Sequence, residues 1–266
     1  MTRPADGAPR LSVVVPVLNE AESIGELIAE IDRALAPIFH HEVIVVDDGS
    51  TDDTLAVLRV LATRYATLRV MRHKSRAGQS AAVRSGVKVA RADWIATLDG
   101  DGQNDPSDLP GLIMRAWNGA DRPSLVGGVR IKRQDSTARR MAGRFANRVR
   151  NTILRDGCPD TGCGIKVFER EVFLDVASFG AMHRFLPALF QMRGRTCVYV
   201  PVNHRPRLRG RSKYGNLKRG LIGLVDLAGV YWLKRRTSVP AASWEEELPP
   251  VAAEQEEQRM NVRSFH

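Results

Sequence analysis

The sequence predicts an open α/β sheet with helices on both faces, and three observations carry this prediction. Apolar strand patterns alternate with amphipathic helix patterns four times within about the first hundred residues. The first strand pattern is almost continuously apolar, which is typical of a parallel strand covered on both faces. The acidic and basic loops follow the strand patterns, so they should meet at the carboxyl edge of the sheet.

The first two strand–helix pairs are predicted from the spacing of apolar residues along the chain. Residues 11–16 (LSVVVP) form the first strand, and a helix over 21–36 follows and ends at Pro37. The buried positions of this helix recur at helical spacing: Ile24, Leu27, Ile28, Ile31 and Leu35. Residues 42–46 form the second strand, and 51–53 cap the next helix. The expected buried stripe of that helix is Leu55, Leu58, Leu61 and Ala62.

The next two pairs lead to the segment that matters most for function. A third strand over 67–71 is followed by a basic loop at 72–78 and a helix over 79–90. A short apolar strand at 94–96 then opens into the loop 97–106. Further on, we expect a helix from about Pro106 and strands at 124–130, 165–168 and 196–202.

Two carboxylates one residue apart stand in the loop 97–106. Asp99 and Asp101 are hard oxygen ligands separated by a glycine, so both can turn toward one ion, and Gln103 can add a neutral oxygen. Such ligation suits Mg²⁺ or Mn²⁺ bridging substrate phosphates. The same residue types also form ordinary turns. The convergence of separate acidic loops at one sheet edge is what favours the metal site.

Positive charge dominates the folded part of the chain. The formal net charge is +10, and the segment from Ala241 onward holds six glutamates against two arginines, or −4, which leaves about +14 on residues 1–240. Such an excess indicates an anionic partner. A nucleic acid is not expected, because no aromatic platform accompanies the arginines and the acidic pairs would be unexplained. The three cysteines show neither the pairing pattern of disulfides nor the spacing of a zinc site. We therefore expect them to be free thiols that pack in the interior.

Arginines crowd into two segments of the second half. A helix over 137–154 places Arg140, Arg144 and Arg148 in one stripe, which is either a solvated face or a phosphate site. The basic loop at 204–214 has the composition of a mobile, phosphate-seeking segment.

The ends of the chain predict three further segments. Residues 1–9 read as a disordered leader and 238–266 as an acidic disordered tail. Between them, 216–237 reads as an amphipathic helix that is too interrupted to span a membrane. We expect it to lie at a membrane surface, with packing on the protein core as the alternative. Its apolar positions are Leu217, Leu221, Leu224, Val225, Ala228 and Trp232, flanked by Lys218, Arg219, Lys234, Arg235 and Arg236.

Six segments taken together resemble a known family. They are Pro16–Glu20 (PVLNE), Asp47–Ser50 (DDGS), Asp99–Gln103 (DGDGQ), Gly128–Arg130 (GVR), Asp160–Gly164 (DTGCG) and Arg207–Lys213 (RLRGRSK). In this order they resemble family 2 glycosyltransferases, and within them the dolichyl- or polyprenyl-phosphate sugar transferases typified by dolichol-phosphate mannosyltransferase. The resemblance covers about residues 10 to 235. It implies a GT-A fold, a Rossmann-like open mixed sheet, as a domain over 10–215.

The resemblance also implies roles for individual residues. Asp99, Asp101 and Gln103 would hold Mg²⁺ or Mn²⁺ on the diphosphate of the donor, where the cation neutralises the leaving charge. The nucleotide sugar would be bound by Pro16, Leu18, Glu20, Val46, Asp48 and Gly100. Phosphate contacts would come from Arg130, Arg144, Arg184, Arg207 and Lys213, of which Arg144 and Arg184 are placed by position alone.

The implied reaction is an inverting transfer of a hexose, from GDP-mannose or UDP-glucose, to a polyprenyl or dolichyl phosphate. A lipid phosphate is already an anion and needs orientation rather than a general base, so Asp160 is assigned to orientation beside Arg130 and Arg207. The alternatives are a family 2 transferase with a hydroxyl acceptor and, less favoured, a sugar-nucleotide-binding module without catalysis. The expected location is cytoplasmic, at the cytoplasmic face of an anionic membrane.

Overall fold

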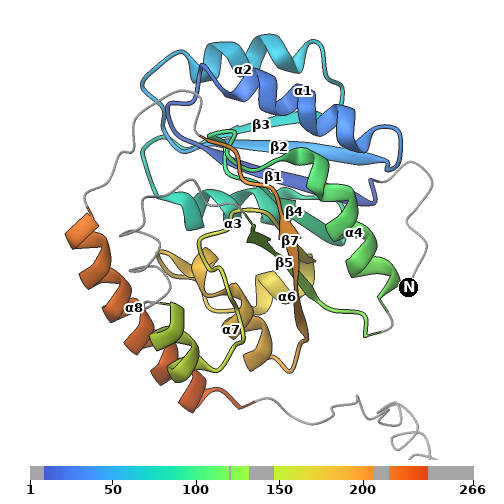
Figure 1. The fold of residues 1–266 in the computed structure, drawn as a ribbon. Coiled ribbons are helices and arrows are strands. Elements are labelled where there is room, and N and C mark those ends of the chain that lie inside the picture. The colour runs from blue at the N-terminus through green and yellow to red at the C-terminus, as the bar shows by residue number, and fades with distance from the viewer. Residues whose placement is uncertain (1–8, 120, 132–146, 207–215, 239–266) are drawn as a thin grey trace, which may run out of the picture.

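A computed structural model describes residues 9–119, 121–131, 147–206 and 216–238 (Figure 1). These residues build one seven-stranded sheet with the order β3-β2-β1-β4-β6-β5-β7. The strands are β1 (Leu11–Val17), β2 (His41–Asp47), β3 (Leu68–Arg72), β4 (Trp94–Thr97), β5 (Leu125–Arg130), β6 (Lys166–Glu169) and β7 (Cys197–Val202). All neighbours pair in parallel except β6, which is antiparallel to both β4 and β5. The predicted open mixed sheet is confirmed.

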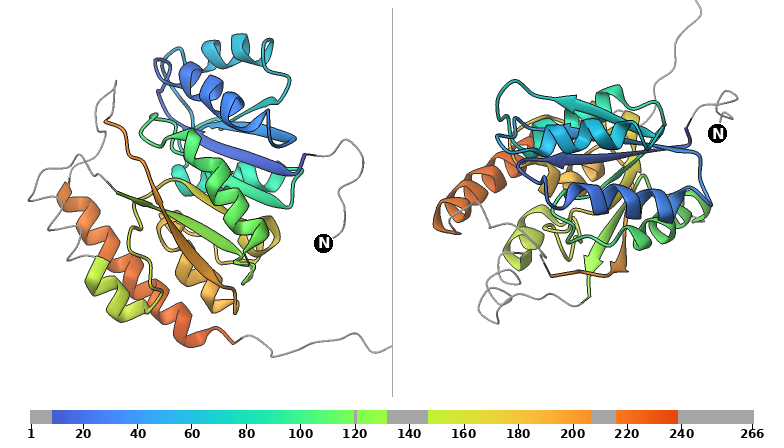
Figure 2. Two further views of the ribbon diagram at one scale, coloured as in Figure 1. Left: turned by 45° about the vertical axis from the view of Figure 1, so that its right-hand side comes forward. Right: turned by 90° about the horizontal axis from the view of Figure 1, so that it is seen from above.

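Helices cover both faces of this sheet (Figures 1 and 2). On one face lie α1 (Ile24–Leu35), α2 (Thr54–Ala62) and α4 (Leu109–Asn118), the last preceded by the short helix η1 (Pro106–Asp108). On the other lie α3 (Gln79–Val89), α6 (Arg170–Asp175), η2 (Met182–Arg184), α7 (Leu186–Met192) and α8 (Asn216–Arg236). Residues 147–154 are also helical.

The central strand β1 shows why this sequence forms a two-faced core. Val13 and Val15 pack with α1 and α4, whereas Val14 between them packs with α3 on the opposite face. Since neighbouring side chains of a strand point to opposite faces, a strand buried on both must be apolar throughout. The two clusters of buried side chains therefore share one layer of backbone.

The predicted strands and the longer helices are confirmed within a few residues. The stripe predicted for α2 is wrong at Ala62, which is exposed, while Leu58 is fully buried. The short helices α6, η2 and α7 were not predicted. Of the helix predicted over 137–154, residues 137–146 lie outside the described residues, as do almost all of the predicted leader and tail.

The helix α8 lies beside residues 147–154 at one side of the molecule (Figures 1 and 2). Leu227 and Val230 are buried against the core, and the ammonium of Lys234 donates to the main-chain oxygen of Leu154. The part of the chain that the structure describes contains no helix long and apolar enough to cross a membrane.

Candidate active site

The loops after β1, β2 and β4 meet at one edge of the sheet. The backbone N–H of Asn19 donates to Ser50 Oγ at 2.8 Å, and that of Glu20 donates to Thr54 Oγ1 at 2.9 Å. The Ser23 hydroxyl donates to the carbonyl of Gly100 at 3.1 Å, which joins the first loop to the third. The predicted convergence at the carboxyl edge of the sheet is confirmed.

The candidate metal ligands follow β4 directly. Asp99 Oδ1 accepts a hydrogen bond from Gln79 Nε2 at 2.7 Å, and the Asp99 backbone N–H donates to Asn104 Oδ1 at 3.1 Å. Asp101 Oδ1 accepts from the backbone N–H of Gln103 at 3.2 Å, which closes the turn. Both carboxylates are half-buried. The buried Asn104 side chain therefore holds the turn that carries the two carboxylates.

The electrostatics of this turn fit a cation. Burial raises the pKa of Asp99 to about 6, and the charge of Asp101 adds to the rise, against the opposing charges of Lys166 and Arg130. The described residues hold no group of three His, Cys, Asp or Glu side chains placed to bind a metal. Asp99 and Asp101 would thus need Gln103 and the oxygens of a diphosphate to complete the coordination of Mg²⁺ or Mn²⁺. The donor set fits such an ion.

Two glycines allow the chain to pass close to this turn. A Cβ on Gly164 would lie 2.3 Å from Asp99 Oδ2, and one on Gly100 would lie 2.6 Å from Val17 Cγ1 and 3.0 Å from the carbonyl oxygen of Pro16. Neither position has room for a side chain. The motifs 99–103 and 160–164, which are far apart in the sequence, are therefore in direct contact.

The carboxylate of Asp48 organises the basic loop after β3. Its Oδ1 lies 2.8 Å from His73 Nδ1 and accepts from the Ala77 backbone N–H at 2.8 Å, while Oδ2 accepts from the Gly78 backbone N–H at 2.7 Å. Asp48 itself is buried. In this geometry it shapes the rim of the predicted nucleotide site with most of its acceptor capacity already used.

The other predicted nucleotide residues divide by exposure. Pro16 and Leu18 are half-buried at the end of β1, and Glu20 Oε2 lies 3.1 Å from the hydroxyl oxygen of Ser23. Val46 is fully buried beneath Gly86 of α3, so only its main chain could reach a nucleotide.

Arg130 and Asp160 form a two-pronged ion pair. Arg130 Nε donates to Asp160 Oδ2 at 2.7 Å, and Nη2 donates to Oδ1 at 2.8 Å. Both side chains are largely buried. Parallel N–H···O contacts fix orientation as well as adding energy. Asp160 is therefore held by a cation at both oxygens, and its role in orientation stays a prediction.

A pocket beside Asp99 contains two polar residues that sequence reasoning missed. Lys166 and His183 line it together with Gln79, Thr97 and Asp99. His183 Nδ1 lies 2.8 Å from Ser80 Oγ at the start of α3. Lys166 had one sequence signal, a charged residue within a predicted buried strand. The predicted phosphate ligand Arg184 is the neighbour of His183, and its charge acts on Asp226 of α8.

The family model described as glycosyl transferase family 2 matches residues 12–176. The chain belongs to this family. This confirms the enzyme class that the six motifs predict.

Two relatives narrow the resemblance within the family. The chain is 34% identical over 234 residues to the dodecaprenyl-phosphate galacturonate synthase of Rhizobium johnstonii, covering 86% of this chain and 69% of that protein. It is 33% identical over 219 residues to the undecaprenyl-phosphate 4-deoxy-4-formamido-L-arabinose transferase of Klebsiella pneumoniae, covering 81% of this chain and 65% of that protein. The chain thus spans about two thirds of their length. The predicted resemblance to polyprenyl-phosphate sugar transferases is confirmed.

Solved structures confirm the GT-A fold. The glucosyl-3-phosphoglycerate synthase of Mycobacterium tuberculosis, in complex with Mn²⁺, UDP and glucosyl-3-phosphoglycerate, matches with a TM-score of 0.63 and 20% identity over 89% of this chain and 82% of that one. A mannosyltransferase of Pyrobaculum calidifontis, in complex with GDP-mannose and Mn²⁺, matches with a TM-score of 0.61 and 21% identity over 88% and 66%.

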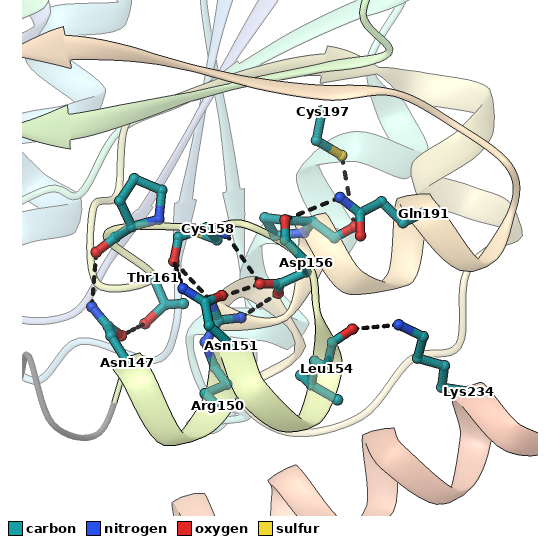
Figure 3. Close-up of polar contacts among 12 residues, drawn as sticks. Asn147, Arg150, Asn151, Leu154, Asp156, Cys158, Thr161, Gln191, Cys197 and Lys234 are labelled. Carbon is teal, nitrogen blue, oxygen red and sulfur yellow. Dashed lines mark hydrogen bonds and ion pairs between the residues drawn. The ribbon is translucent and has the colours of Figure 1, made fainter.

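A buried polar network supports the Asp160 side of this family 2 site (Figure 3). Arg150 pairs with Asp156 and donates to the Cys158 carbonyl at 3.0 Å, while the Asp156 carbonyl accepts from Gln191 Nε2 at 3.0 Å and from the Tyr199 hydroxyl at 3.1 Å. Figure 3 also shows Asn147, whose amide donates to the Pro159 carbonyl at 2.9 Å and whose Oδ1 accepts from Thr161 Oγ1 at 3.1 Å. Asn147 thus holds both neighbours of Asp160 in place.

Three of the predicted phosphate ligands cannot be placed. Arg144, Arg207 and Lys213 lie outside the described residues. The basic loop is described only at its start, where Arg205 pairs with Glu30 and Asp105, each at 2.7 Å. The backbone N–H of Arg205 also donates to the Gln103 carbonyl at 3.0 Å. The start of this loop is therefore fastened to the turn that carries Asp101.

Proposed function

We propose that this glycosyltransferase moves a sugar from a nucleotide-diphosphate donor to a polyprenyl phosphate in one inverting displacement. The observation that carries the proposal is the Arg130–Asp160 pair beside Asp99. A hydroxyl acceptor would need a general base, but the carboxylate placed for that role is engaged by a guanidinium. A lipid phosphate needs no base. The names of the two relatives, which both contain a polyprenyl phosphate, support the same acceptor.

The site residues then divide the work. Asp99, Asp101 and Gln103 would hold Mg²⁺ or Mn²⁺, which when bound neutralises charge on the departing diphosphate. The loop ordered by Asp48 forms one wall for the nucleotide. Arg130 orients the acceptor phosphate while Asp160 fixes the direction of its guanidinium. Arg144, Arg184, Arg207 and Lys213 remain proposed phosphate contacts.

The donor sugar is proposed only as a class. UDP-glucose and GDP-mannose are the first donors to test, and the relatives' names add galacturonate and 4-deoxy-4-formamido-L-arabinose as sugars carried by similar proteins. The common requirement is a diphosphate that reaches Asp99 and Asp101.

We further propose that α8 rests on the cytoplasmic face of an anionic membrane. The helix buries Leu227 and Val230, yet leaves Val225 72% and Trp232 62% exposed. The basic residues Lys234, Arg235 and Arg236 close its last turn. An apolar helix face with cations at its end suits the boundary between headgroups and acyl chains. The helix would thereby bring the site to its lipid acceptor.

The test is formation of an organic-extractable product from radiolabelled donor and undecaprenyl phosphate. Wild-type protein with Mn²⁺ should form it, EDTA should stop the reaction reversibly, and Asp101→Ala should lower the rate at least a hundredfold while circular dichroism and the unfolding midpoint stay unchanged. Full activity of the wild type in metal-free buffer would contradict the metal site. Faster transfer to a soluble hydroxyl acceptor than to the lipid would favour the alternative family 2 reaction.

A further inference from the structure

A buried lysine stands beside the pocket without a carboxylate to pair with. Lys166 is 5% exposed, and its ammonium donates to the main-chain oxygen of Cys163. None of the ion pairs within the described ranges includes it. Since an ammonium carries three N–H donors, the single main-chain acceptor leaves two of them without an acceptor, and the charge of Lys166 interacts with Asp99 without a direct ion pair.

Such a residue is costly for the fold. A buried ammonium loses its hydration, and proteins normally offset that loss with a direct ion pair. An apolar side chain of similar length would fill the same space in β6 without this cost. The charge of Lys166 does oppose the rise in the pKa of Asp99, but a lysine serving that purpose alone would be expected to pair with Asp99 directly. The geometry therefore indicates a ligand.

We infer that Lys166 is the cationic end of an anion subsite in this pocket, and that it takes a carboxylate or phosphate oxygen of a substrate. This rests on the proposed function, because the same pocket includes Asp99 from the proposed metal turn and Pro16 from the predicted nucleotide site. His183 and Gln79 line the same space and can orient the bound group. The diphosphate already has the metal turn as its partner. Two anions are left: a carboxylate on the donor sugar, and the phosphate of the acceptor.

The test compares Lys166→Met with Lys88→Met, which removes the same charge from an exposed position on α3. Isothermal titration in Mn²⁺ buffer would measure the affinity of each protein for UDP, UDP-glucose, UDP-glucuronate and geranyl phosphate. Lys166→Met should fold with an unfolding midpoint at or above that of the wild type and should bind UDP normally. It should lose about tenfold to a hundredfold in affinity for one anionic group, the range of a charge-assisted hydrogen bond. Lys88→Met should match the wild type throughout.

The pattern of loss identifies the anion. A loss for UDP-glucuronate but not for UDP-glucose assigns the subsite to a sugar carboxylate, whereas a loss for geranyl phosphate alone assigns it to the acceptor. Unchanged affinity for all four ligands would overturn the inference and leave the proposed function standing. So would a lower midpoint with an equal loss for every ligand, since that is the result for a packing residue. A folded wild type that binds none of the four, and no GDP-mannose either, would overturn the proposed function and this subsite together.

Discussion

At the scale of single residues, the candidate site depends on a glycine at position 164, which has no side chain. Asp99 Oδ2 lies where a Cβ on Gly164 would be only 2.3 Å away. The carboxylate proposed to bind the metal is therefore packed against bare backbone. Any side chain at 164 must displace either Asp99 or the segment that carries Asp160.

Gly164→Ala should accordingly lower kcat about a hundredfold, the cost of moving a reacting group by about 1 Å. The control is Gly111→Ala on α4, where a Cβ would meet nothing within 4 Å and the helix should gain about 0.5 to 1 kcal/mol in unfolding free energy. Transfer assays and thermal unfolding of both variants check this. Equal activity of the two variants would contradict the close packing of Gly164 on Asp99.

A second residue-scale prediction concerns Glu42, which is buried in β2. Burial by itself raises its pKa, but hydrogen bonds from Ser12, the Arg91 backbone N–H and Arg69 outweigh this and hold the pKa below its ordinary value. A lowered pKa stabilises the fold above the unfolded-state value of 4.5, and this stabilisation is lost as the pH falls through the folded-state pKa.

Glu42→Gln should therefore cost about 2 kcal/mol in unfolding free energy at pH 7, and the difference from the wild type should shrink below about pH 4.5. Urea unfolding at a series of pH values measures it. The exposed Glu22→Gln serves as the control and should show no such difference. A cost that stayed constant down to pH 3 would show that the carboxylate charge is not involved.

At the scale of elements, α8 packs on the protein core, and contact with a membrane surface, the other role that the sequence left open for it, remains our proposal. It packs on the core through Leu227 and Val230, and it also exposes the predicted apolar stripe at Leu224, Val225 and Trp232. One helix can do both because the two sets lie on different faces. The side chains of Leu217 and Leu221 lie outside the described residues.

The variant Val225→Glu/Trp232→Gln should bind anionic vesicles several-fold more weakly, because it removes apolar area and adds a negative charge at the surface. Val60→Glu, at an exposed apolar position on α2, is the matched control. Co-sedimentation with anionic and neutral vesicles at low and high salt measures the effect, and wild-type binding should weaken with salt. If the wild-type protein co-sediments with neither vesicle type, the membrane proposal is ruled out.

The elements also show what the sequence could predict. Long apolar runs such as 11–16 and the regular spacing of α1 are local signals, and both are confirmed. The helices α6 and α7 are only six and seven residues long, too short to develop a helical period. The candidate metal site at Asp99 and Asp101 could be predicted because the two carboxylates are neighbours in the sequence. The nearness of Gly164 and Lys166 to Asp99 depends on β6 pairing with β4, which no local pattern reveals.

At the scale of the molecule, the site is shared between distant parts of the chain. The turn after β4 supplies the carboxylates, the segment between β5 and β6 supplies Asp160, and η2 supplies His183 to the pocket. The buried pair of Arg150 and Asp156 was not predicted, because in the sequence Arg150 adjoins the stripe of Arg140, Arg144 and Arg148, for which a solvated face and a phosphate site were the two expectations. Only the folded chain distinguishes it from its neighbours.

The hydrogen bond between the Arg205 backbone N–H and the Gln103 carbonyl has a consequence for the design of truncated forms of this protein. The family match ends at residue 176, but β7 still has to close the sheet against β5, and Arg205 reaches back from beyond β7 to the central turn. A fragment cut at the family boundary would leave β5 as a bare edge and the turn without its brace. We therefore expect the shortest autonomous catalytic fragment to continue past Arg205.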